Sequence, residues 1–254
     1  MSRNKLEEKE FHDTYVTSTE TRSLESNFYC AAARELEYEI SFDFVGDLHG
    51  KKLLFYGSGA HLSLIRKFVQ RGADVVAIDI SPETIEKLNR TMAEEEELRN
   101  RCEAMVMDCE SLTFPAASFD IVFARSIIHH LDVCRSLEEI SRVLKPCGKF
   151  TVLEPLGTNP LINLYRLFTP NARTSGERPL VPSDIEAVGR LFPVTKAHYL
   201  YCLSILAYFY RMIDRNEARF NKLFATLCKL DRTFLKTIPG YRYLCWDVLL
   251  CCER

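Results

Sequence analysis

Residues 51–81, KKLLFYGSGAHLSLIRKFVQRGADVVAIDIS, decide the fold of this chain. The apolar run 53–56 is typical of a buried parallel strand. Gly57 and Gly59 then let the chain turn sharply and bring backbone N–H groups close to a ligand. After a helical stretch, a second strand ends in Asp79, whose carboxylate can accept hydrogen bonds from both ribose hydroxyls of an adenosine. The segment therefore predicts half of a nucleotide-cofactor site.

Three more strand candidates follow in the order that an open α/β sheet requires. The first ends at Asp108, the second is the run 119–124, and the third is the run 149–154. Helical spacing of hydrophobic residues separates them, with Ser81 as the predicted cap of one helix and the end of another within 142–148. The chain thus alternates strands and helices, as parallel sheets do.

At this point the chain resembles the class I S-adenosylmethionine (SAM)-dependent methyltransferases. The resemblance covers about residues 50–156 and points to the type 11-like branch, small-molecule enzymes related to the quinone-biosynthesis methyltransferases. It depends on the order, the spacing and the residue types of successive motifs: Asp79, Asp108, SFDIVFA (118–124), HHL (129–131), RVLKPCGKF (142–150) and LEPLGTNP (153–160).

The resemblance implies an α/β fold with a Rossmann-like, seven-stranded, mostly parallel sheet and helices on both faces. It implies one methyltransferase domain over residues 1–254, with the SAM-binding core at 50–156 and an N-terminal helical cap at 1–45. The segments 157–182 and 203–238 are expected on the acceptor side, the second as a helical insertion before the last strand.

The same resemblance assigns the cofactor, SAM, and the residues that hold it. Asp79 would bind the ribose, and Asp108 would accept a hydrogen bond from the adenine amino group. The full set of predicted SAM-binding residues is Gly57, Ser58, Gly59, Asp79, Ile80, Asp108, Cys109 and Ala124.

Two residues depart from the family's first motif, which usually reads Asp-x-Gly-x-Gly-x-Gly. Phe55 replaces the acid and His61 replaces the last glycine. The acid normally orients the methionine end of SAM through its ammonium group. Without it, either SAM binds more weakly or another residue supplies the contact, and His61 adds bulk near the carboxylate of SAM.

Two histidines are candidates for catalysis, and each has a structural alternative. His129, like its neighbour His130, either acts as a base or stabilises a loop. His12 lies in the segment FHD, which matches a subgroup of the family, although a His-Asp pair on an N-terminal helix is usually a surface feature. No metal site is predicted, because the ten cysteines show no paired Cys-x-x-Cys spacing and are better interpreted as small buried hydrophobes in a reducing compartment.

The amino-acid composition limits the classes of protein to which this chain can belong. A chain of 254 residues with 47% hydrophobic content can bury one sizeable core. A net charge of −2 gives no electrostatic case for nucleic acid as a partner. The charged start of the chain and the absence of a long apolar run predict a cytoplasmic protein with no transmembrane segment. The oligomeric state is left open.

Two strand candidates, 194–202 and 241–252, predict a terminal antiparallel pair around the apolar insertion. The aromatic stripe of that insertion, with Tyr208 and Phe209, either packs in the core or lines a pocket for a hydrophobic acceptor. The prediction is methyl transfer to O or N of a hydrophobic small molecule, a specialised metabolite. The alternatives are a non-catalytic SAM-fold binding protein, or a C-methyltransferase of a quinone- or lipid-like acceptor.

Overall fold

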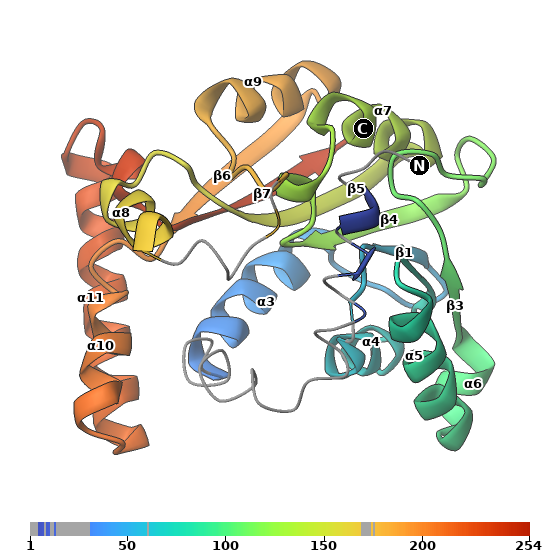
Figure 1. Ribbon diagram of the computed structural model, residues 1–254, viewed down its shortest axis with the longest axis horizontal. Helices are drawn as coiled ribbons and strands as arrows, with labels where there is room; N and C mark the ends of the chain where they lie inside the picture. Colours follow the sequence, from blue (N-terminus) through green and yellow to red (C-terminus); the bar gives the residue numbers. More distant parts are fainter. Residues whose placement is uncertain are drawn as a thin grey trace.

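The structure is a computed structural model that describes residues 5–7, 9–10, 13, 31–59, 61–168, 174 and 176–254. Helices cover both faces of one central sheet (Figure 1). In chain order the elements are α3 (Ala31–Val45), β1 (Lys52–Tyr56), α4 (Leu62–Val69), β2 (Asp74–Asp79), α5 (Pro82–Glu94), α6 (Glu96–Arg101), β3 (Cys102–Val106), β4 (Phe119–Arg125), the 3₁₀ helix η1 (Ile128–His130), α7 (Val133–Val143), β5 (Leu144–Pro155), α8 (Pro160–Phe168), α9 (Pro182–Leu191), β6 (Val194–Leu200), α10 (Leu206–Ile213), α11 (Glu217–Thr237), the 3₁₀ helix η3 (Tyr241–Leu244) and β7 (Asp247–Glu253).

The sheet has seven strands in the order β3-β2-β1-β4-β5-β7-β6. The strands from β3 to β5 run parallel, and β7 lies antiparallel between β5 and β6. The strand order reverses between β1 and β4, and open α/β sheets bind ligands beyond the carboxyl ends of the strands at such a point. The predicted fold class, a seven-stranded and mostly parallel Rossmann-like sheet, is confirmed.

The run 53–56 shows why the sheet is covered on both faces. Leu53 and Phe55 pack with α3, α4 and α5 on one face, and Leu54 and Tyr56 pack with α7 and α9 on the other. All four side chains are fully buried. A strand buried on both faces must be apolar throughout, which is the pattern that the sequence has here.

The N-terminal helix α3 is part of this core. Tyr38 and Val45 of α3 pack in the same cluster as the strands, and α3 lies beneath the sheet (Figure 1). The region predicted as a cap, 1–45, therefore includes a helix that builds the sheet's lower layer.

Two predicted strand starts move in the structure. The helix ends at Val143, within the predicted range 142–148, but β5 begins at Leu144 rather than at Lys149, in keeping with the extended backbone that Pro146 favours for the residue before it. The strand expected from Tyr241 begins at Asp247. Residues 241–244 instead form η3 after Gly240, which has φ +79°.

The predicted insertion 203–238 forms two helices, α10 and α11. The Asn216 side chain accepts a hydrogen bond from Arg219 N at 3.0 Å and so starts α11 as a separate helix. Tyr208 is buried with Phe220, whereas Phe209 is exposed. The aromatic stripe is thus partly buried in a separate hydrophobic cluster that packs against β5 and β7.

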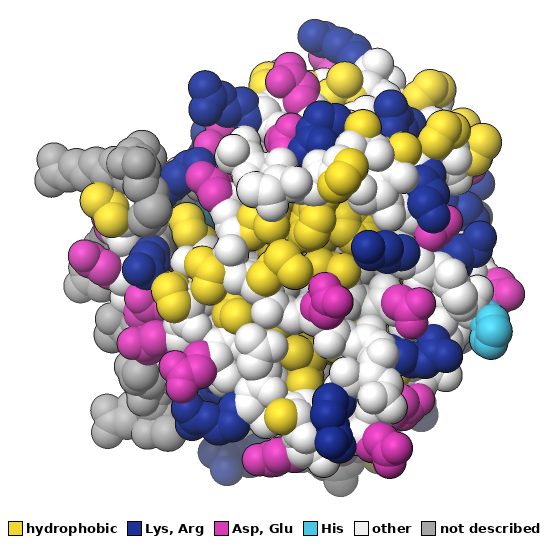
Figure 2. All heavy atoms as spheres, turned by 90° about the vertical axis from the view of Figure 1, so that its right-hand side faces the viewer, with side chains coloured by type: hydrophobic (Ala, Val, Ile, Leu, Met, Phe, Trp, Pro, Cys, Tyr) yellow, Lys and Arg dark blue, Asp and Glu magenta, His cyan; other side chains and the backbone are white. Residues whose placement is uncertain are grey.

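The surface mixes charge types. On the face shown in Figure 2, basic and acidic side chains alternate around a central group of hydrophobic side chains. Among the cysteines that the structure describes, none forms a disulfide. Cys109, Cys245, Cys251 and Cys252 are buried, as small hydrophobes would be, while Cys134 and Cys147 are exposed and do not fit that interpretation. Within the described part of the chain, no helix has the length and apolarity to cross a membrane.

Candidate active site

The glycine turn after β1 forms the floor of the site. Gly57 has φ +64° and Gly59 has φ +48°, a backbone region that favours glycine. A Cβ on Gly57 would lie 2.3 Å from Ile127 Cγ1, so this position needs glycine for packing as well as for conformation. Gly59 has more room, and its N–H donates to Asp79 Oδ2 at 2.9 Å.

Asp79, at the carboxyl end of β2, is oriented by backbone groups on two sides. Gly59 N donates to one carboxylate oxygen, and Ser81 N donates to the other at 2.9 Å. Ser81 Oγ in turn accepts from Thr84 N and caps α5, as predicted. These bonds hold the carboxylate at the cavity wall, and each oxygen keeps further lone pairs for a ligand.

The loop after β3 carries a second acidic group. Asp108 Oδ2 and Glu110 Oε2 both accept from Lys5 Nζ, at 2.6 and 2.7 Å. Beside them, Tyr56 donates its hydroxyl to the Cys109 carbonyl at 2.6 Å, which fixes this loop to β1. Burial, with the nearby Asp79 carboxylate, raises the pKa of the Cys109 thiol well above its usual value, so Cys109 contributes a neutral wall.

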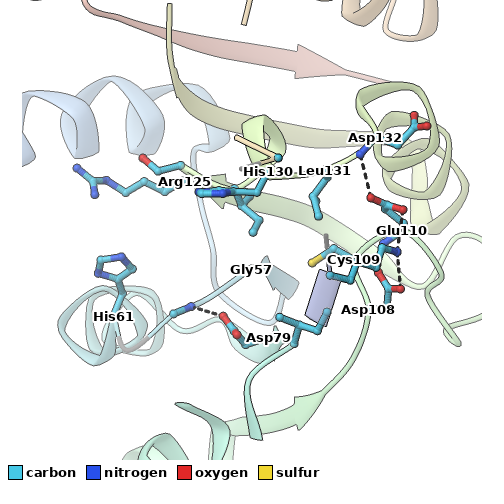
Figure 3. A pocket seen from close by; sticks show the side chains of 16 residues that line it. Gly57, His61, Asp79, Asp108, Cys109, Glu110, Arg125, His130, Leu131 and Asp132 are labelled. Carbon is cyan, nitrogen blue, oxygen red and sulfur yellow. Dashed lines mark hydrogen bonds and ion pairs between the residues drawn. The ribbon is translucent and has the colours of Figure 1, made fainter. Parts of the chain in front are cut away.

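These groups line one cavity of about 380 Å³ at the carboxyl ends of β1, β2 and β4. Figure 3 shows its two ends: Asp108, Glu110 and Asp132 lie on one side, and Arg125 and His61 lie on the other. The lining residues are Lys5, Gly57, Gly59, His61, Asp79, Ile80, Asp108, Cys109, Glu110, Arg125, Ser126, Ile127, His130, Leu131, Asp132 and Gly176.

The basic end is organised by a buried network. Arg125, the last residue of β4, donates to Glu37 of α3 from Nη2 at 2.9 Å and from Nε at 3.3 Å. Tyr201 donates its hydroxyl to the other Glu37 oxygen at 2.8 Å. Burial raises the pKa of the nearby Asp247 carboxyl well above its usual range, and the negative charge of Glu37 adds to that effect. The Arg125 guanidinium is therefore held in position by the buried Glu37 carboxylate.

Phe55 and His61 occupy the motif positions where the family has an acid and a glycine. Phe55 is fully buried and packs edge-on against Phe68 and Phe123. The His61 ring lies over Phe55 and faces the cavity (Figure 3). Loss of hydration among the surrounding protein and the positive charges of Arg125 and Arg34 lower the pKa of His61 to about 4, so its imidazole is neutral at pH 7.

The two adjacent histidines after β4 have different surroundings. His129 is buried, and its Nδ1 lies 2.5 Å from Glu154 Oε2. The other Glu154 oxygen accepts from Ile127 N and Ile128 N, so this buried carboxylate anchors the whole turn. His130 instead lines the cavity.

The structure places most of the predicted SAM-binding residues together. Gly57, Gly59, Asp79, Ile80, Asp108 and Cys109 all line the cavity. Ser58 and Ala124 are fully buried beside it but are not among its lining residues. Of the two catalytic candidates, His129 is hydrogen-bonded to Glu154 and does not line the cavity, and His12 lies outside the described residues.

Sequence reasoning missed Arg125, Glu110 and Lys5. Arg125 directly follows the predicted strand 119–124, so the rule that ligands bind at the carboxyl ends of strands could have found it. Lys5 and Glu37 gave no local signal, because their partners lie 103 and 88 residues away along the chain.

Comparison with known proteins identifies similar sequences and folds. Residues 56–152 match the family model described as a methyltransferase domain. Among curated proteins, a sterol 4-C-methyltransferase of Caenorhabditis elegans is 32% identical over 35% of this chain and 26% of its own length. The 27-O-demethylrifamycin SV methyltransferase of Amycolatopsis mediterranei is 31% identical over 41% of this chain and 38% of its own length.

Among solved structures, phosphoethanolamine N-methyltransferase 2 of Haemonchus contortus superposes with a TM-score of 0.68 at 17% identity, covering 100% of this chain and 60% of that one. Geranyl diphosphate C-methyltransferase of Streptomyces coelicolor gives a TM-score of 0.61 at 16% identity, covering 87% and 79%. The chain spans between about a quarter and two fifths of the length of the curated relatives that it matches.

Proposed function

We propose that this chain is a class I SAM-dependent methyltransferase, whose cavity binds SAM and which transfers a methyl group to a small molecule. The match of residues 56–152 to the methyltransferase-domain model supports this proposal. The observation that carries this proposal is the polarity of the cavity. Carboxylates line one end and a guanidinium lines the other (Figure 3). SAM has a complementary polarity, since adenosine offers hydrogen-bond donors and the methionine end offers a carboxylate.

The acidic end fits adenosine. Asp79 and Asp108 lie at the ends of neighbouring parallel strands and line the same cavity, which is the arrangement that ribose and adenine require. Two predicted contacts follow: the ribose hydroxyls donate to Asp79, and the adenine amino group donates to Asp108. Lys5 is shared between Asp108 and Glu110 and balances their charge.

At the basic end, another residue can orient the methionine end of SAM in place of the acid that the first motif lacks. In place of a carboxylate that would hold the ammonium of SAM, the chain has buried Phe55, and the charged group lining this end is Arg125. We expect Arg125 to hold the carboxylate of SAM, with neutral His61 beside it. The methionine end would thus be oriented through its negative group rather than its positive one.

Bound SAM would supply an activated methyl group on its sulfonium, and the chain would hold the acceptor and SAM in the orientation that the transfer needs. Holding the nucleophile in line with the methyl carbon and sulfur provides much of the acceleration in such a displacement. We expect the acceptor's O or N to approach from the His130 side, where Ile127 and Leu131 supply apolar wall. A hydrophobic acceptor suits that wall.

Several finer points stay predictions. O- or N-methylation is the reaction that we propose, with C-methylation as the alternative, and the relatives' names include both a sterol C-methyltransferase and a demethylrifamycin methyltransferase. Catalysis by His129 or His12, the assignment of 157–182 and 203–238 to the acceptor side, and a cytoplasmic location are also predictions. Among the described residues of these two segments, Gly176 lines the cavity.

Isothermal calorimetry with SAM and S-adenosylhomocysteine is the direct test. We expect one site per chain and micromolar affinity, followed by transfer of the labelled methyl group to an acceptor found by mass spectrometry of copurified small molecules. A folded protein that binds neither ligand would contradict the proposal and favour the non-catalytic alternative.

A further inference from the structure

One cluster of side chains beside the cavity has the composition of a metal site. His129, His130 and Glu177 each bring one potential ligand atom to within 4.8 Å of the others. The histidines come from η1, and Glu177 comes from the segment that follows α8. Two imidazoles and one carboxylate form a ligand set that zinc and similar divalent ions accept, and such ions hold a further position for water or substrate.

The hydrogen bond between His129 and Glu154 prepares this cluster for a cation. Glu154 is fully buried and ionised carboxylates only accept hydrogen bonds, so Nδ1 of His129 carries the hydrogen across the 2.5 Å contact. The lone pair of a neutral His129 then resides on Nε2. Histidines that bind metal ions commonly donate their other N–H to a carboxylate in this way, which fixes the ring and increases its basicity.

Charge around the cluster also favours a cation. Glu177 accepts a hydrogen bond from Arg166 through Oε1 at 2.5 Å, and its second carboxylate oxygen carries lone pairs of its own. The Glu154 and Glu177 carboxylates are both largely buried. A divalent ion would offset the remaining negative charge where water screens it least.

We propose that His129 Nε2, a ring nitrogen of His130 and a carboxylate oxygen of Glu177 bind one divalent transition-metal ion such as Zn²⁺. The predicted absence of a metal site considered only the cysteines, and this set uses none. The proposed metal site lies at the wall of the cavity, because His130 and Gly176, the residue before Glu177, line that cavity. The open position of the ion therefore faces the cavity.

This position defines the ligand that the ion would take. We infer that the ion's fourth partner is an oxygen donor entering from the cavity, such as a hydroxyl or an enol. This part rests on the proposed function, since the donor would be the methyl acceptor. Coordination would lower the pKa of that hydroxyl, and the ion rather than an imidazole would then contact the acceptor oxygen.

The first test is metal binding by the purified protein after treatment with a chelator. Zn²⁺ is titrated in competition with a chromophoric chelator, and Co²⁺ serves as a spectroscopic probe. We expect one ion per chain, weakened at least tenfold in His130→Gln and in Glu177→Gln. The matched control is His198→Gln, because His198 lies on β6, away from the cavity.

The visible spectrum of the Co²⁺-loaded protein tests the open position. Acetohydroxamate, a small bidentate oxygen ligand, should change that spectrum in the wild type. Absence of Zn²⁺ binding at one millimolar, or equal binding in wild type and both variants, would overturn the metal site and identify the cluster as an ordinary ion pair beside a structural histidine. SAM binding measured with the chelator present tests the proposed function separately, because none of the three ligands is among the residues assigned to SAM.

Discussion

The two ends of the cavity are built by different means. At the acidic end, Asp79 is oriented by backbone N–H groups of its own half of the sheet, from Gly59 and Ser81. At the basic end, Arg125 is oriented by side chains, Glu37 and, through it, Tyr201, from elements far away in the chain. Backbone-held groups follow from local motifs, whereas the network around Arg125 exists only after α3 has packed against the sheet.

The largest expected effect concerns the glycine turn at the acidic end. Gly59→Val should abolish measurable SAM binding, because a branched side chain would enter the cavity that Gly59 lines. Gly50→Val is the matched control: Gly50 also has positive φ, at +67°, but has open space around it and lies away from the cavity. Calorimetry on both folded variants makes the measurement. Normal SAM affinity in Gly59→Val would show that the turn is only structural.

Next in size is the loss of the Asp79 carboxylate. Asp79→Ala removes two hydrogen bonds to a charged acceptor, each worth roughly 1.5–3 kcal/mol, so SAM affinity should fall by about 100-fold or more. Asp74→Ala, at the opposite end of the same strand, should bind SAM as the wild type does. Equal affinity in the two variants would remove Asp79 from the site and undermine the cofactor assignment.

At the basic end, we expect the free energy of unfolding to depend on the charge of the buried side chains rather than on their size. Glu37→Gln removes the carboxylate that pairs with the largely buried Arg125 and should reduce the free energy of unfolding by about 3 kcal/mol. Asp247→Asn should cost less than about 1 kcal/mol, because burial raises the pKa of the Asp247 carboxyl well above its usual range and so favours the neutral form that Asn resembles.

Urea unfolding at several pH values separates these two variants. A carboxyl whose pKa is raised on folding destabilises the protein as pH rises above the unfolded value, because ionisation then favours the unfolded chain. Asp247→Asn should therefore gain stability relative to wild type between acidic and neutral pH. A loss at pH 7 as large as that of Glu37→Gln would mean that Asp247 is ionised and paired.

The smallest expected effect is the uptake of a proton by His61 when SAM binds. The pKa of His61 is lowered to about 4, and a SAM carboxylate placed beside it should raise that pKa. Binding at pH 5 should then take up a fraction of a proton, and binding at pH 8 should take up none from this group. Calorimetry in two buffers of different ionisation enthalpy measures the uptake. His61→Asn should abolish it; an unchanged uptake would place the carboxylate elsewhere.

The sequence by itself determined the alternation of strands and helices, the glycine turn and the two strand-end acids. Each of these depends on local periodicity or on the residue at the end of a strand, and the carboxyl ends of neighbouring parallel strands necessarily meet at one edge. Six of the eight predicted SAM-binding residues line the cavity for this reason.

Only the tertiary structure decided what surrounds those residues. Glu37 meets Arg125 across 88 residues, Lys5 meets Asp108 across 103, and Glu177 meets His129 and His130, which precede it by 48 and 47 residues. None of these pairs has a spacing that a helix or strand imposes. They form because packing of the buried faces brings distant segments together, and a charge enclosed there is stable only beside an opposite charge or a hydrogen-bonding partner.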